Sequence, residues 1–98
     1  MHLYNRINKE ELKQRLAEET FERKTISFYR YFILDDPQTF RDDLFRDWFP
    51  LDCFGRIYVA REGINAQMSV PEHNWNAFLE TLQKYEIFEN IPIKYAIE

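Results

Sequence analysis

The feature that most constrains the fold is a pair of alternating runs on either side of Glu62 and Gly63. Residues 64–70 alternate strictly between apolar and polar side chains, and residues 56–61 show the same alternation more weakly. Successive side chains of a strand point to opposite faces of a sheet, so each run offers one face to a core. The two runs predict a β-hairpin that turns at Glu62-Gly63, where Gly63 supplies a backbone conformation with positive φ.

Further segments complete the pattern of a small α+β domain. Residues 24–34 are rich in β-branched and aromatic residues and apolar on both faces, which predicts a central strand. An acidic N-cap followed by Pro37 predicts a helix that ends near residue 49, before Pro50. The remaining predicted elements are a helix at about 72–84, opened by Pro71, and a last strand at 93–97.

The N-terminal segment predicts one additional helix, at 9–19. Asn8 is its expected N-cap, with Glu11 three residues on as the capping-box partner. Few apolar residues recur along this helix, so we expect it to lie on the surface and lean on the main body.

The order β-α-β-β-α-β predicts a ferredoxin-like (acylphosphatase-like) α+β sandwich with a four-stranded antiparallel sheet and an extra N-terminal helix. A chain of 98 residues is expected to form one domain. We assign residues 1–23 to an N-terminal helical extension and residues 24–98 to the ferredoxin-like domain. Two helices would cover one face of the sheet and leave the other face open.

Strand alternation predicts which side chains the open face carries. Ile57, Val59, Ile64, Ala66 and Met68 are assigned to the helix-covered side. The open face then carries three tyrosines and two amides, and these are candidate binding residues: Tyr29, Tyr31, Tyr58, Asn65 and Gln67. Three interpretations stay open: ordinary exposed strand residues, packing against another domain, and stacking of RNA bases on the aromatic rings.

Charge adds few candidates for binding an anion. Residues 1–34 hold seven Lys and Arg against five acidic residues, whereas residues 35–98 hold six against twelve. Nucleic-acid binders usually present a basic face, which this balance does not favour. Arg30 and Lys24 are possible phosphate contacts. Arg61 and Glu62 flank the hairpin turn and join the candidate binding residues, although a solvated hairpin tip is the simpler interpretation of both.

Catalytic and metal-binding patterns are not evident in the sequence. Cys53 follows an acidic residue and lies between apolar ones, a setting that predicts a buried filler rather than a nucleophile. His2 and His73 lack ligand spacing with Cys53, so no metal site is predicted. We predict no catalytic residue and no cofactor. A carboxylate-rich stretch contains Asp47 and is expected to be a solvated helix face neutralised by arginines: Arg41, Asp42, Asp43, Arg46 and Asp47.

The cellular compartment is predicted from the cysteine count and from the apolar runs of the sequence. A single cysteine excludes an internal disulfide. No apolar run approaches the roughly 20 residues that a membrane span needs, and the N-terminal residues lack the apolar stretch of a secretory signal. These features predict a cytoplasmic protein without a membrane partner.

Several segments resemble the rhodanese-like tRNA uridine hydroxylase family: "RINKEELKQ", "TISFYRYF", "DPQTFRDDL" and "FGRIYVAREGINAQMSVPEHNWNAF". The resemblance covers nearly the whole chain, and its most specific part runs from Phe54 to Pro71. It implies a ferredoxin-like domain excised from a longer parent that also carries a rhodanese domain with a reactive cysteine. Cys53 does not match that cysteine loop.

The resemblance also implies a function for the parent protein, namely oxygen-dependent hydroxylation of the wobble uridine of tRNA. We therefore expect an accessory domain of a tRNA-modifying oxidoreductase. It would help to position the tRNA anticodon arm or pack on the rhodanese domain of the same chain. The alternative is a purely structural, protein-interaction domain without RNA contact. The segment "ILDDPQ" is acidic and free of glycine, so the anion-binding loop of an acylphosphatase is not expected there.

Overall fold

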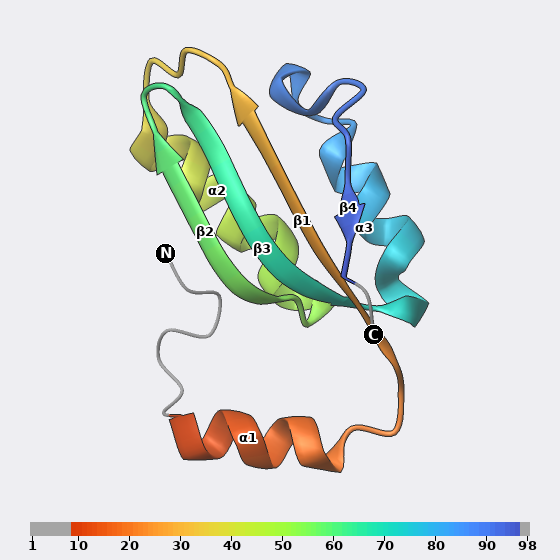
Figure 1. Ribbon diagram of the computed structural model, residues 1–98. Coiled ribbons are helices and arrows are strands. Elements are labelled where there is room, and N and C mark those ends of the chain that lie inside the picture. Colours follow the sequence, from red (N-terminus) through yellow and green to blue (C-terminus); the bar gives the residue numbers. More distant parts are fainter. Residues whose placement is uncertain (1–8, 97–98) are drawn as a thin grey trace.

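The computed structural model describes residues 9–96, apart from a few side chains of the first helix (Figure 1). The predicted N-cap Asn8, and His2, lie outside the described residues. The elements are α1 (Lys9–Glu18), β1 (Arg23–Tyr31), α2 (Pro37–Trp48), η1 (Phe49–Leu51), β2 (Phe54–Ala60), β3 (Gly63–Pro71), η2 (Glu72–Asn74), α3 (Trp75–Leu82), η3 (Glu86–Phe88) and β4 (Lys94–Tyr95).

The four strands form one antiparallel sheet in the order β2-β3-β1-β4. Strand β3 lies between β1 and β2, as the split β-α-β arrangement requires. Helices α2 and α3 lie behind the sheet in the view of Figure 1, and the face toward the viewer carries no helix of the sandwich. The predicted ferredoxin-like α+β fold is confirmed, and so is the central position of β1.

The alternation of β3 is reproduced residue by residue. Ile64, Ala66, Met68 and Val70 are buried against the helices, while Asn65 and Gln67 are exposed. The same alternation of side chains along β1 places Ile26 and Phe28 in the core, and along β2 it places Ile57 there.

Three element bounds differ from the prediction. Strand β1 ends at Tyr31, but the chain continues beside the hairpin turn, because the Phe32 N–H donates to the Glu62 carbonyl (2.8 Å). The helix predicted from residue 72 begins with the 3-10 turn η2, a common way for an α-helix to start. Strand β4 has only two residues in the ladder, although the Ala96 N–H still donates to the Thr25 carbonyl (2.9 Å).

Trp48 at the end of α2 is the centre of the core. Its side chain is fully buried and its ring centroid lies 5.5 Å from that of Phe78 on α3 and 6.3 Å from that of Phe28 on β1. The indole Nε1–H donates to Thr81 Oγ1 (2.8 Å), so the one polar atom of this ring is satisfied. The segment after α3 contributes a further buried pair that the sequence reading did not anticipate, Ile87 and Phe88 of η3.

The prediction that Asp47 faces water is wrong. Its side chain is only 8% exposed and accepts from the Tyr85 hydroxyl (2.5 Å) and the Lys84 ammonium (2.8 Å). Burial by itself opposes the charged carboxylate, but the hydrogen bonds from Lys84 and Tyr85 outweigh it, so the pKa of Asp47 lies below its ordinary value. Burial and the same bond to Asp47 raise the pKa of Tyr85. Asp47 therefore joins α2 to the segment after α3.

Gly63 adopts φ +144°, as predicted for a positive-φ turn glycine. A Cβ at this position would lie 2.0 Å from the Arg30 carbonyl oxygen of the neighbouring strand. The hairpin can approach β1 this closely only because the residue has no side chain.

Asp47→Asn should lower the free energy of unfolding by about 2 kcal/mol at pH 7, because a charged acceptor of two hydrogen bonds is lost. The folded pKa of Asp47 lies below 3.8, so its contribution is complete above that pH and disappears as the pH falls through the folded value. Urea unfolding at several pH values should show wild type and variant converge in acid, as the pH falls through the folded pKa of Asp47. Asp42→Asn, on the exposed side of the same helix, is the control. A difference that persisted in acid would contradict the electrostatic account.

Gly63→Ala should destabilise the domain by about 3 kcal/mol or more, because it combines an unfavourable φ with a backbone clash. Thermal unfolding followed by circular dichroism measures the effect. Asn65→Ala, an exposed position two residues along the same strand, should change stability by less than about 1 kcal/mol. Equal effects of the two substitutions would show that the close approach at Gly63 is not needed.

Candidate functional site

The open face of the sheet brings together the predicted aromatic and amide side chains. In the strand register Asn65 lies directly opposite Tyr58 on one side and Tyr29 on the other. The tyrosines are among the most exposed large side chains: Tyr29 is 58%, Tyr58 60% and Tyr31 85% exposed. The rings of Tyr29 and Tyr31 lie 6.0 Å apart between centroids. Cross-strand neighbours stand about 5 Å apart at Cβ, so Tyr58, Asn65 and Tyr29 form one continuous row.

A second row lies two residues further along the strands. Arg56 pairs with Gln67, Gln67 with Ser27, and Ser27 with Lys94. Arg56 and Lys94 thus stand at the two outer strands of the open face. Sequence reasoning missed both residues as binding candidates, although Arg56 shares its parity with Tyr58 and could have been found from that alternation.

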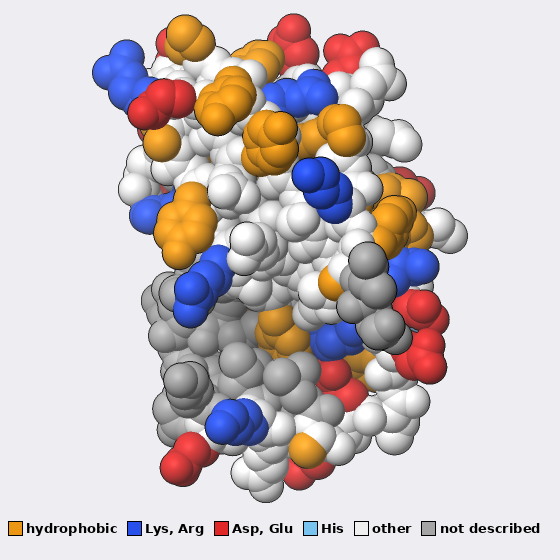
Figure 2. Space-filling model, viewed as in Figure 1, with side chains coloured by type: hydrophobic (Ala, Val, Ile, Leu, Met, Phe, Trp, Pro, Cys, Tyr) orange, Lys and Arg blue, Asp and Glu red, His pale blue; other side chains and the backbone are white. Residues whose placement is uncertain are grey.

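The charges that the strands present on the open face are all positive: Arg23, Arg56 and Lys94. The carboxylates of the described residues lie on the helices, in the connecting segments and at the hairpin turn. Figure 2 shows this face, with blue and orange side chains over a largely white surface and most red side chains around its margins. The net charge of −4 therefore does not describe this face.

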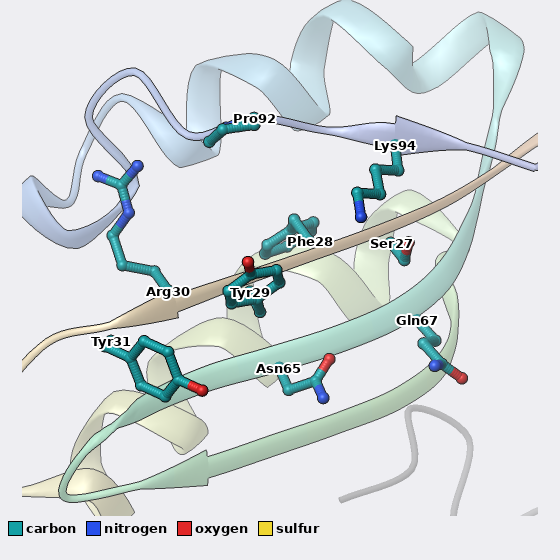
Figure 3. A pocket seen from close by; sticks show the side chains of 9 residues that line it. All are labelled: Ser27, Phe28, Tyr29, Arg30, Tyr31, Asn65, Gln67, Pro92 and Lys94. Atoms are coloured by element: carbon teal, nitrogen blue, oxygen red, sulfur yellow. The ribbon is translucent and has the colours of Figure 1, made fainter.

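Beside these rows the surface is hollowed between β1 and the segment that leads into β4 (Figure 3). The hollow has a volume of about 540 Å³. Tyr29, Tyr31, Asn65, Gln67 and Lys94 line it from the open face. Polar groups and aromatic rings in one concave surface are typical of a ligand site.

Two predicted phosphate contacts, Arg30 and Lys24, alternate in phase with the buried residues of β1, so their Cα–Cβ bonds point to the helix-covered face. Arg30 donates to the Glu89 carbonyl through Nη1 (2.7 Å) and so braces the segment after η3. The Lys24 ammonium lies 4.0 Å from the Glu72 carboxylate and 5.6 Å from the centroid of the Trp75 ring. Each is therefore already engaged within the domain. Arg30 nevertheless lines the hollow together with Tyr29 and Tyr31, whereas Lys24 does not line it.

The hairpin tip places Arg61 and Glu62 at the end of the sheet. Both side chains are exposed, and their carbonyls accept from the Leu34 and Phe32 N–H groups (2.8 Å each). The tip is therefore fixed to the chain that leaves β1, while its side chains remain available at the rim of the open face.

Residues 23–98 match the family model described as the UPF0176 acylphosphatase like domain. The chain belongs to this family. It is 49% identical to a tRNA uridine(34) hydroxylase of Leptospira interrogans over 96 residues, which cover 98% of this chain and 26% of the relative. It is 46% identical to a protein of the same name from Hamiltonella defensa, covering 98% of the chain and 27% of the relative, and 55% identical over 76 residues to one from Yersinia enterocolitica, covering 78% and 22%.

These matches confirm the resemblance to the tRNA uridine hydroxylases. The chain spans about a quarter of the length of the curated relatives it matches. No solved structure matches it significantly. The part of the chain that the structure describes holds no helix both long and apolar enough to cross a membrane.

The family description raises the question of an acylphosphatase-type anion site before α2. The Asp36 carboxylate caps this helix, accepting from the Thr39 N–H (3.1 Å) and the Thr39 hydroxyl (2.7 Å). These hydrogen bonds lower the pKa of Asp36. A second anion at this helix start would meet a negative charge, so the geometry does not favour a phosphate there.

Cys53 is fully buried, and burial raises the pKa of its thiol to about 12. This is the filler that the sequence predicted, because a thiol protonated at neutral pH is a poor nucleophile. Among residues 9–96 the structure contains no cluster of three or more His, Cys, Asp or Glu side chains suited to a metal ion.

One end of the open face is closed by Arg23. Its guanidinium lies 4.0 Å above the Phe54 ring, donates to the Asp52 carbonyl (2.7 Å) and, through Nε, to the Glu19 carboxylate (2.7 Å). These contacts join the segment after α1 to the sheet and to the turn before β2. The accessible part of the face therefore extends from Arg56 and Gln67 to the hairpin tip.

Arg23→Ala should lower the free energy of unfolding by about 2–3 kcal/mol, because its side chain is 11% exposed and its partners lose charge-assisted hydrogen bonds. Chemical denaturation measures this change. Arg46→Ala, an arginine that is 66% exposed, should cost less than about 1 kcal/mol. Similar costs for both arginines would contradict the role given to Arg23.

Proposed function

We propose that this domain is an accessory domain of a tRNA-modifying oxidoreductase that hydroxylates uridine 34, the wobble uridine. In this proposal it helps to position the tRNA anticodon arm through its open face. The name shared by the relatives, tRNA uridine(34) hydroxylase, supports the reaction and the substrate. One observation carries the positioning role: among the described residues, a sheet face without a covering helix combines three exposed tyrosines with exclusively positive strand charges.

Physical chemistry favours RNA as the ligand of such a face. Bases stack on exposed aromatic rings, and this contact tolerates any base because every base has a π-face. The amides of Asn65 and Gln67 each offer donors and an acceptor for base edges. Arg56 and Lys94, which have no salt bridge among the described residues, attract a phosphate backbone.

The chemical step would belong to the rest of the parent chain. Cys53 is shielded and protonated at neutral pH, so it is a poor candidate for the reactive cysteine of a rhodanese domain. We assign residues 24–98 to the accessory domain and residues 1–23 to its helical extension. A role on tRNA would place the protein in the cytoplasm.

A second candidate function is packing of this domain on the rhodanese domain of the same parent. One observation favours it: Ile33 is 80% exposed beside Tyr31, which is 85% exposed, where the chain leaves β1. Adjacent exposed apolar side chains of this size are typical of interaction surfaces. In this case the domain would be structural and would make no contact with RNA.

The double substitution Tyr29→Ala and Tyr58→Ala should weaken binding of an anticodon stem–loop RNA by about tenfold or more, since each stacked base contributes about 1–3 kcal/mol. Fluorescence anisotropy with the chain of residues 1–98 measures the affinity. Tyr95→Ala is a matched control, because Tyr95 is 58% exposed but contacts Trp75 on the helix-covered side. Unchanged affinity in the double variant would leave the open face a scaffold or a docking surface for protein.

A further inference from the structure

We propose that the open face binds a single, unpaired strand of RNA that crosses the four strands of the sheet. Its phosphates lie at Arg56 and Lys94, and its bases stack on Tyr29 and Tyr58. This inference rests on the proposed function and deepens it, because it names the form of RNA, the path of the strand and the residues that contact phosphate.

The path follows from the row that contains the two basic residues. Arg56, Gln67, Ser27 and Lys94 occupy successive strands in register, one residue from each of β2, β3, β1 and β4. Neighbouring strands are about 4.8 Å apart, so Arg56 and Lys94 stand about 14 Å apart across the sheet. Within the described residues neither side chain has a salt bridge of its own, and Gln67 and Ser27 between them carry no charge. A phosphate backbone that crosses the sheet would meet a positive charge at each edge.

The positions of the RNA bases follow from the neighbouring row of side chains, which contains the tyrosines. Tyr58, Asn65 and Tyr29 lie two residues along the strands from Arg56, Gln67 and Ser27, a separation of about 7 Å. Backbone over one row and bases over the next is the geometry of a nucleotide lying flat on a sheet. The Asn65 amide stands between the two rings, where it can hydrogen-bond the edges of bases stacked on either side. Figure 3 shows Tyr29 and Asn65 on the same side of the ribbon, beside the hollow.

The same arrangement discriminates against a duplex. Bases in an A-form helix are stacked on each other and paired, so their faces are not available to tyrosine rings. Two basic side chains at opposite edges also differ from the long basic stripe that a duplex backbone needs. Arg23 and the hairpin tip bound the face along the strands, and the sheet is only four strands wide along the proposed path, which restricts the site to a short unpaired segment such as a loop.

The test measures binding of residues 1–98 to a single-stranded RNA of about ten nucleotides and to a blunt duplex of the same length, as a function of salt. We expect the single strand to bind at least about tenfold more tightly than the duplex. Replacing Arg56 and Lys94 together by Gln should weaken single-strand binding. It should also reduce the slope of log K against log salt by about 0.7 for each lost phosphate contact.

Lys24→Gln is the matched control, because it removes one positive charge from the helix-covered side and should leave the salt slope unchanged. The inference is overturned if the duplex binds as tightly as the single strand, or if Arg56→Gln with Lys94→Gln leaves the slope unchanged. In either case RNA binding that depends on Tyr29 and Tyr58 would still uphold the proposed function. If neither RNA binds, the proposed function fails as well, and the face is assigned to protein docking.

Discussion

The register between β1 and β3 is the constraint on which the rest of this structure depends. The ladder runs from Arg23 opposite Pro71 to Tyr31 opposite Gly63. It sets Phe28 beside Ala66 in the core and Tyr29 beside Asn65 on the open face. A slip of one residue would exchange these faces, exposing phenylalanine and burying tyrosine and asparagine. Gly63 fixes the register at one end, because only a residue without Cβ can lie so close to the Arg30 carbonyl.

Much of the fold could be predicted because it rests on periodicity. Strict alternation identified β3 and both of its faces, and Pro37 with Asp36 identified the start of α2. The role of Asp47 could not be predicted in this way. Its partners Lys84 and Tyr85 lie nearly forty residues further along the chain. Helix periodicity does not register such distant partners, so it predicted that Asp47 is exposed to solvent like its neighbours on the helix. The short ladder of β4 and the turn η3 likewise depend on tertiary packing.

The candidate site was predictable in its aromatic part and not in its charged part. Parity placed Tyr29, Tyr31 and Tyr58 on one face, and the structure leaves all three exposed there. Regional charge pointed to Arg30 and Lys24, but the alternation of the strand assigns both to the helix-covered side, and each has a partner within the domain. Net charge is a sum over the whole surface, whereas a ligand meets one face. Here the carboxylates lie around a face whose strands carry only positive charge.

The central claim is that the open face is the RNA-binding surface of this domain. The most direct measurement is chemical-shift mapping of isotopically labelled residues 1–98 titrated with an anticodon stem–loop RNA, at low salt and near physiological salt. The account predicts shifts centred on Tyr29, Tyr58, Asn65 and Gln67 that persist as salt is raised. Shifts confined to the helices, or shifts that vanish with salt, would contradict it and would place the RNA site elsewhere.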